Sequence, residues 1–243
     1  MGSCYAKPTV DYALDQVGNE CGKTNKYSAI LDSVKYFNTP KNGYADSCSI
    51  FVNACVLLGG CVDPSADDDI EAAKWTALYM MYEPQDGSNA AAGCTQAAGY
   101  FKSHDAWYTN PKDFERGDQI FFWKSNKAIY HTGIIVDWDE NGIYTVEGNT
   151  NGGMVAKKFY SYDDERIAGV GRPRYDGWEI SGNEGKEKEK TWDEIFTDIA
   201  RDCVQGKYGN YPDRKHKVNA LGYGNIYSEV QKRVNMIMAG LLK

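Results

Sequence analysis

A cysteine, a histidine and a glutamate in this chain of 243 residues have the residue types and local settings that nucleophilic catalysis needs. Cys48 lies in "YADSCSIFVNACVLLGG", near the start of a predicted helix. A helix N-terminus stabilises a thiolate with its free N–H groups and the positive end of its dipole, and the same amides can receive an oxyanion. Free cysteine is also among the residues most often buried in cores, so the position of Cys48 alone leaves both interpretations open.

His131 and Glu147 lie on neighbouring predicted strands that the turn signal "DENGI" joins. If these strands pair antiparallel, the alternation of side chains between the two faces can bring His131 and Glu147 together. An imidazole whose tautomer is fixed by a carboxylate can take the proton of a thiol. Asn149 could share the orienting role. A histidine at a strand end can also merely hydrogen-bond the backbone. Only Cys48, His131 and Glu147 together therefore predict a nucleophilic site.

The elements that position these residues follow from the spacing of apolar side chains. Phe51, Ala54, Cys55 and Leu58 recur at helical spacing up to Gly59-Gly60, and Asp46 or Ser47 is the expected N-cap. Helices followed by an antiparallel meander predict an α+β domain. Four short segments rich in β-branched and aromatic residues predict the strands 118–123, 131–138, 142–149 and 166–175.

A loss of apolar periodicity marks a domain boundary. Residues 178–191, "WEISGNEGKEKEKT", have the composition of a solvated linker, so we expect a domain over 1–177 and a second over 192–243. Thr191 and Glu194 form a capping box for a helix that begins at about residue 192. A short helix after Pro212, ending near Gly222, and a third from about 226 to 241 complete a predicted three-helix bundle.

The bulk properties exclude several classes of protein. A net charge of −7 disfavours nucleic-acid binding, and no apolar run is long enough to span a bilayer. The N-terminus shows no signal peptide, so we expect synthesis in a cytoplasm. Seven irregularly spaced cysteines indicate reduced thiols, and the scattered histidines predict neither a metal site nor a cofactor. The acidic cluster Asp67 to Asp69 is typical of the first turn of a helix.

The order of Cys48 and "HTGIIVDWDENGIYTVEGN" closely resembles the CHAP family, the cysteine- and histidine-dependent amidohydrolases and peptidases of phage endolysins and bacterial wall hydrolases. The segments 93–101, 117–122 and 166–176 also look like an endolysin subgroup of that family. The resemblance covers about residues 25–176 and implies a papain-like fold. Its implied catalytic set is Cys48 as nucleophile, His131 as general base and then acid, Glu147 as orienting partner and Asn149 as a fourth polar member.

The chain departs from this family pattern at two points. Ser47 stands where relatives in the subgroup usually carry an aromatic residue. This change could loosen the wall of the substrate cleft or serve the helix cap instead, and it removes no catalytic group. Some CHAP enzymes hold calcium in an Asp-rich loop ahead of the cysteine. From Phe37 to Ser47 only Asp46 is acidic, so we expect no calcium in that loop.

Residues 199–240 resemble the three-helix cell-wall-binding repeat of some streptococcal phage lysins, through "GKYGN", "DRK", "LGY" and "VQKRVN". The resemblance implies binding to the glycan and stem peptide of peptidoglycan. Tyr208, Arg214 and Tyr223 are the candidate contacts, because a ring can stack on a sugar and a guanidinium can hold a carboxylate. Alternatively, the tyrosines pack the bundle core and Arg214 is an ordinary surface charge. A single copy of a weak module would bind the wall more tightly if several chains were joined, because linked modules gain avidity. Homo-oligomerisation through this module is therefore a hypothesis.

Taken together, the sequence predicts a peptidoglycan hydrolase of the phage endolysin type. The Cys48 thiolate is expected to attack an amide, either the bond from muramic acid to L-alanine or one in the stem or cross-bridge peptide, and to form a thioester. Such an enzyme would reach the wall after its release from the host cytoplasm at lysis. Two alternatives remain open: a wall-binding protein that has lost catalysis, and an acyl transferase in which an amine intercepts the thioester.

Overall fold

The computed structural model describes residues 3–45, 47–61, 70–84, 90–178, 192–219, 221 and 226–242. The chain divides into two compact units, Met1–Ile180 and Ser181–Lys243. Of the predicted linker, only Trp178 lies within the described residues. The first unit carries all four residues of the predicted catalytic set.

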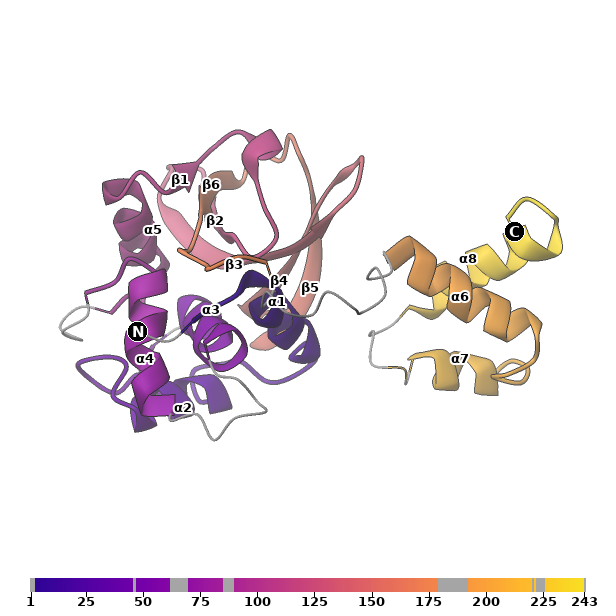
Figure 1. Ribbon diagram of the computed structural model, residues 1–243, viewed down its shortest axis with the longest axis horizontal. Helices are drawn as coiled ribbons and strands as arrows, with labels where there is room; N and C mark the ends of the chain where they lie inside the picture. The colour runs from indigo at the N-terminus through magenta and orange to yellow at the C-terminus, as the bar shows by residue number, and fades with distance from the viewer. Residues whose placement is uncertain are drawn as a thin grey trace. The chain divides into compact units, whose positions relative to one another are not determined.

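Helices make up the first half of the first unit (Figure 1). Helix α3 (Cys48–Cys55) continues directly into a π-helical turn, η1 (Val56–Gly60), so the predicted end at Gly59-Gly60 is confirmed. These glycines let η1 pack on the first helix, because a Cβ at Gly59 would lie 2.6 Å from the carbonyl oxygen of Pro8. The helices are α1 (Ala6–Asp15), α2 (Lys26–Ser33), α3 (Cys48–Cys55), α4 (Ile70–Met80) and α5 (Cys94–Ser103).

A six-stranded sheet follows the helices, in the spatial order β1-β6-β2-β3-β4-β5 (Figure 1). All its strand pairs are antiparallel. The unit is therefore α+β, as predicted. The strands are β1 (Trp107–Tyr108), β2 (Gln119–Trp123), β3 (Ile129–Trp138), β4 (Gly142–Thr150), β5 (Met154–Ser161) and β6 (Ile167–Gly171), with a 3₁₀ turn η2 (Pro111–Asp113) after β1.

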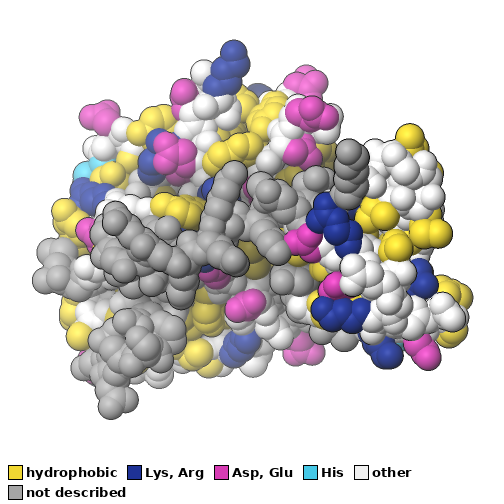
Figure 2. Space-filling model, turned by 45° about the vertical axis from the view of Figure 1, so that its right-hand side comes forward, with side chains coloured by type: hydrophobic (Ala, Val, Ile, Leu, Met, Phe, Trp, Pro, Cys, Tyr) yellow, Lys and Arg dark blue, Asp and Glu magenta, His cyan; other side chains and the backbone are white. Residues whose placement is uncertain are grey.

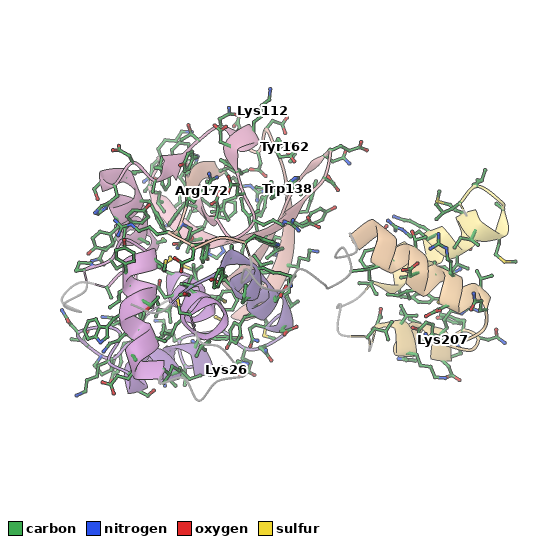
Figure 3. All side chains as sticks on the ribbon, viewed as in Figure 1. Lys26, Lys112, Trp138, Tyr162, Arg172 and Lys207 are labelled. Atoms are coloured by element: carbon green, nitrogen blue, oxygen red, sulfur yellow. The ribbon has the colours of Figure 1, made fainter. Side chains whose placement is uncertain are left out.

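The four predicted strands correspond to β2, β3, β4 and β6, with one error of length. β6 ends at Gly171 instead of near residue 175, because Arg172 leaves the sheet and its Nε donates to Asp118 Oδ1 at 3.0 Å. Figure 3 shows Arg172 over the sheet of the first unit. The sequence prediction missed β1 and β5.

Side chains of β3 alternate between two apolar clusters. Ile134 and Val136 belong to the large core shared with the helices, whereas Ile135 packs with Phe122 and Ile143 in a second cluster. Helix α3 lies against β3 and β4. Its approach to β4 depends on Gly148, where a Cβ would lie 2.5 Å from Phe51 Cβ. The sheet therefore holds the start of α3 and the start of β3 in one rigid unit.

The second unit contains the three helices α6 (Trp192–Val204), α7 (Asp213–Asn219) and α8 (Tyr227–Met238). α7 ends before the predicted Gly222, and the predicted apolar stripe of the third helix extends too far, because Leu241 lies beyond α8 and is 75% exposed. Thr191 of the predicted capping box lies outside the described residues. The buried apolar residues of this unit are Ile199, Ala200, Cys203, Val218, Ile226, Val230 and Val234.

The described surface mixes charges of both signs. On the face that Figure 2 shows, Lys and Arg side chains are interspersed with Asp and Glu side chains. A nucleic-acid-binding face would gather positive charge along one track. Within the described residues, no helix combines the length and the apolar composition needed to cross a membrane.

Candidate active site around His131

His131 and Glu147 form a hydrogen-bonded pair across β3 and β4. His131 Nε2 lies 2.9 Å from Glu147 Oε2, and Thr145 Oγ1 donates to the other carboxylate oxygen, Oε1, at 2.6 Å. The side chain of Glu147 is only 1% exposed and that of His131 is 16% exposed. A buried carboxylate needs such partners, because an unpaired one would be destabilised by the loss of water. The predicted pairing of His131 with Glu147 is confirmed.

The strand register explains why Glu147 can reach a histidine that is not directly opposite. Ile134 pairs with Val146, and extending this register by one residue puts Gly133 beside Glu147. A Cβ at Gly133 would lie 2.5 Å from Glu147 Cγ. The absence of a side chain at Gly133 therefore leaves the space through which Glu147 extends to His131.

The pair fixes the imidazole in one orientation. Because an ionised carboxylate only accepts hydrogen bonds, the proton shared with Glu147 lies on His131 Nε2, and Nδ1 is left as the acceptor. Phe122 stacks on the ring, with 5.9 Å between the centroids. Burial and the Glu147 carboxylate raise the pKa of Tyr160 above its usual value, so this neighbour remains a neutral phenol.

Cys48 is the first residue of α3, as its sequence setting predicts. It is buried, and backbone N–H groups of Ser49 and Thr132 donate to its thiol. Thr132 follows His131 on β3, so this contact sets the sulfur beside the strand that carries the imidazole. Both amides lower the pKa of Cys48. The neighbouring Cys94 thiol and burial have a larger, opposite effect, and the pKa of Cys48 lies well above its usual range.

Cys94 is a second thiol at a helix start, which the sequence interpretation did not single out. It is the first residue of α5, and its thiol hydrogen-bonds the thiol of Cys48. That bond lowers the pKa of Cys94 to about 7, and the nearby His131 adds to the effect. The two thiols therefore titrate as a coupled pair, in which one S–H donates to the other sulfur. The sequence signal was "GCTQAAGYF", a cysteine directly before a helical repeat of Ala97, Ala98 and Phe101.

Ser47 occupies the N-cap position of α3 but does not cap it. Its hydroxyl donates to the carbonyl of Gly22 at 2.6 Å and accepts from Asn25 Nδ2 at 2.8 Å. The prediction of a Ser47 cap is therefore wrong, because contacts from a distant segment take the hydroxyl. The other candidate cap, Asp46, lies outside the described residues. Ser47 instead ties the segment before α2 to the start of α3.

Asn149 borders the site without joining the His131–Glu147 pair. It has a left-handed backbone, with φ of 54°, and its backbone hydrogen-bonds the thiol of Cys21. In the part of the chain that the structure describes, no hydrogen bond joins the Asn149 side chain to His131. Asn149, His131 and Glu147 line a common cavity of about 700 Å³. This volume lies within the range of small-molecule binding sites.

The residues predicted to bind the wall differ in their settings. Tyr208 packs against the apolar core of the second unit, and its hydroxyl lies 3.4 Å from Asp202 Oδ2. Arg214 Nε donates to the carbonyl of Gly209 at 2.9 Å. Tyr223 lies outside the described residues. Tyr211, which the sequence interpretation passed over, is 69% exposed. The core position favours a packing role for Tyr208.

Metal-ligand types do not gather in the described ranges. No group of three or more His, Cys, Asp or Glu side chains that could hold a metal ion is found there. The acidic cluster Asp67 to Asp69, predicted to open a helix, lies outside the described residues, and α4 begins at Ile70.

Comparison with known proteins bears on the second unit most directly. A family described as the CW_7 repeat matches residues 197–238, and this repeat indicates a cell-wall-binding role for the unit. A search of curated proteins found no match. Among solved structures, one titled "The crystal structure of Ly7917" is similar at 12% sequence identity and a TM-score of 0.41, over 70% of this chain and 62% of that chain. This chain thus spans less than two thirds of that protein's length.

Proposed function

We propose that the protein is a peptidoglycan hydrolase whose first unit cleaves an amide of the cell wall and whose second unit binds the wall. The observation that carries the proposal is the hydrogen bond of His131 to the buried Glu147, beside two thiols at helix starts, in a chain that also has a CW_7 repeat. A papain-like arrangement, with a cysteine at a helix start and a histidine on a strand, is part of the proposal. So is an origin in a phage or prophage, with release to the wall at lysis.

The reaction begins with transfer of the Cys48 thiol proton to His131 Nδ1, the ring nitrogen that Glu147 leaves free. The thiolate attacks the amide carbonyl, and the oxyanion of the tetrahedral intermediate needs hydrogen-bond donors beside it. Backbone N–H groups at the start of α3 supply them. His131 then protonates the leaving amine, the amine departs, and a thioester remains on Cys48. Water activated by the same imidazole hydrolyses the thioester and regenerates the thiol.

Glu147 acts by orienting His131 and by stabilising the imidazolium that forms during each proton transfer. Its second hydrogen bond, from Thr145 Oγ1, holds the carboxylate in the required rotamer. Because Glu147 is almost fully buried, its interaction with the imidazolium is weakly screened by solvent.

The test is digestion of purified Gram-positive peptidoglycan by the wild-type chain and by Cys48→Ala, followed by mass spectrometry of the fragments. Wild-type protein should release fragments that carry one new amine and one new carboxyl group, which also identifies the bond that is cut. Cys48→Ala should release none while it still sediments with the wall. Equal fragment release by both proteins would overturn the proposal. Products that carry an added external amine in place of the new carboxyl would indicate acyl transfer.

A wall-binding protein without catalysis is the second candidate function. The raised pKa of Cys48 and its burial favour it, because an ionised, accessible sulfur is what attacks an amide. This candidate predicts binding to walls from several susceptible species with no fragment release and no loss of turbidity in cell suspensions. Lysis that disappears in Cys48→Ala would reject it.

A further inference from the structure

The cavity beside His131 has a composition that bears on the substrate. His131 and Glu147 form one part of its lining, and the rest comes from Gly22, from Tyr130 on β3, from the end of β4 and the turn after it, from β5 and from the residue before β6. Its lining includes two cations, Lys158 and Arg166, and the rings of Tyr130 and Tyr160. A substrate held against His131 would therefore extend over positively charged and aromatic side chains.

The charges in this cavity are unevenly compensated. Glu147 is committed to His131 and Thr145. Arg166 forms two hydrogen bonds with Asp164, from Nη2 at 2.6 Å and from Nε at 2.9 Å. Lys158 Nζ instead donates to a neutral group, the side-chain carbonyl of Asn151, at 2.5 Å. An ammonium has three donors, so this contact leaves Lys158 both charge and hydrogen-bonding capacity for a ligand.

Lys158 is held on the same face of the sheet as the catalytic pair. It pairs with Thr145 across β4 and β5, and Tyr160, two residues further, pairs with Ile143. Because side chains alternate along a strand, Lys158 shares the face of Thr145 and Glu147, whereas Lys157 points to the opposite face. Lys157 Nζ accordingly lies 4.8 Å from the ring centre of Tyr144, outside this cavity.

The turn that borders the cavity has a defined shape. Asn149, Asn151, Gly152 and Gly153 all have positive φ, and the N–H of Cys21 donates to the carbonyl of Gly153 at 2.6 Å. The bond from Lys158 to Asn151 connects this turn to β5. A preformed cavity loses less conformational entropy when it binds a ligand.

We propose that this cavity is a carboxylate subsite, in which Lys158 binds a free carboxylate of the substrate's peptide on the side of His131. The inference rests on the proposed function and deepens it by naming the substrate class, an acidic stem peptide. An ammonium and a carboxylate form a charge-assisted hydrogen bond. Tyr130 and Tyr160 cover the apolar part of the same peptide. Amidation of that carboxylate removes the charge and should weaken the interaction.

The test uses two muropeptides that differ only in whether the carboxyl group of the glutamyl residue is free or amidated. Wild-type protein should have a kcat/KM about tenfold higher for the free acid, the effect expected of one charge-assisted hydrogen bond. Lys158→Gln should lose most of this preference, and Lys158→Glu should reverse it. Lys157→Gln is the matched control and should keep it. Equal kcat/KM for both muropeptides in the wild type, or an unchanged preference in Lys158→Gln, would overturn the inference.

A binding measurement separates this inference from the proposed function. Cys48→Ala and the double variant Cys48→Ala with Lys158→Gln are titrated with the same two muropeptides by calorimetry. For each protein, the Kd of the amidated muropeptide is divided by the Kd of the free acid. Both proteins share the second unit, so its contribution is the same in the two ratios that are compared. A ratio near tenfold that falls toward one in the double variant supports the subsite even if the wild type cleaves neither muropeptide. A ratio near one in both proteins contradicts it even if the wild type cleaves both.

Discussion

Glu147 Oε2 lies 2.9 Å from His131 Nε2, and this contact runs diagonally across the β3–β4 pair, over the position of Gly133. A carboxylate in this position determines which imidazole nitrogen carries the proton. It therefore determines whether Nδ1 can accept a proton from a thiol.

Glu147→Gln should lower kcat by about 10²- to 10⁴-fold, because the amide keeps the shape of the side chain but loses the charge that stabilises the imidazolium. The change in kcat is measured by the rate of fragment release from purified wall. Glu140→Gln is the matched control: Glu140 is exposed in the turn between β3 and β4, and its variant should retain wild-type activity. Comparable rates for the two variants would exclude an orienting role for Glu147.

Gly133→Ala should impair catalysis through Glu147. The new Cβ would lie 2.5 Å from Glu147 Cγ and 2.9 Å from the carbonyl oxygen of Val146, so the carboxylate must move away from His131. We expect a loss of activity comparable with that of Glu147→Gln, and little further loss when the two changes are combined. A crystal structure of the variant with the His131–Glu147 bond intact would contradict this reasoning.

The thiols beside His131, Cys48 and Cys94, should titrate as a pair. The hydrogen bond with Cys48 lowers the pKa of Cys94 to about 7, so thiolate absorbance at 240 nm should rise as the pH passes through about 7. Cys94→Ser should remove this step. Cys48→Ala should move it to higher pH, because the main stabilising donor is lost. A step that persists unchanged in both variants would show that another thiol titrates there.

Glu83 should make stability depend on pH. It is fully enclosed, and burial raises its pKa from 4.5 to about 8, an effect that hydrogen bonds from Ala91 and Asn53 reduce only in part. The folded state then binds the proton more tightly than the unfolded state. The contribution of Glu83 to the stability is fully present below about pH 4.5 and is lost as the pH rises toward 8. Denaturant unfolding of the wild type and of Glu83→Gln at several pH values measures this effect. The unfolding free energy should fall by a few kcal/mol over this pH window in the wild type and should not fall in Glu83→Gln.

Tyr208 should support the fold of the second unit more than its contact with the wall. Tyr208→Ala removes a ring packed against the apolar core and should lower the unfolding free energy of this unit by about 2 to 4 kcal/mol. Tyr208→Phe keeps the ring and should leave both stability and wall binding nearly unchanged. Arg214→Gln should instead weaken sedimentation with the wall while the unit stays folded. A loss of wall binding in Tyr208→Phe would assign the hydroxyl a direct role.

Local patterns predicted the pairing of His131 with Glu147, because strand alternation and a short turn constrain which residues can meet. The same patterns located Cys48 at the start of α3 and the end of that helical segment at Gly59-Gly60. Each of these features depends on residues that lie close together in the sequence, and so the α+β class was also predictable.

Features that depend on contacts between distant segments were missed. The role of Cys94 follows from the packing of α5 beside α3, and the hydroxyl of Ser47 is taken by Gly22 and Asn25. β5 was missed because Lys157 and Lys158 interrupt its apolar alternation, although the "TNGG" turn before it is a hairpin signal. One of these lysines lies over the ring of Tyr144 and the other lines the cavity, so the sheet accommodates both.

The residue that becomes acylated during turnover distinguishes the proposed mechanism from its alternatives. A muropeptide substrate is mixed with the wild-type protein, the reaction is quenched in acid within one turnover, and the peptides are analysed by mass spectrometry. We expect an acyl group on the peptide that contains Cys48, absent from His131→Ala and removed by hydroxylamine. An acyl group on Cys94 instead, or fragment release with no acylated cysteine at any quench time, would contradict it.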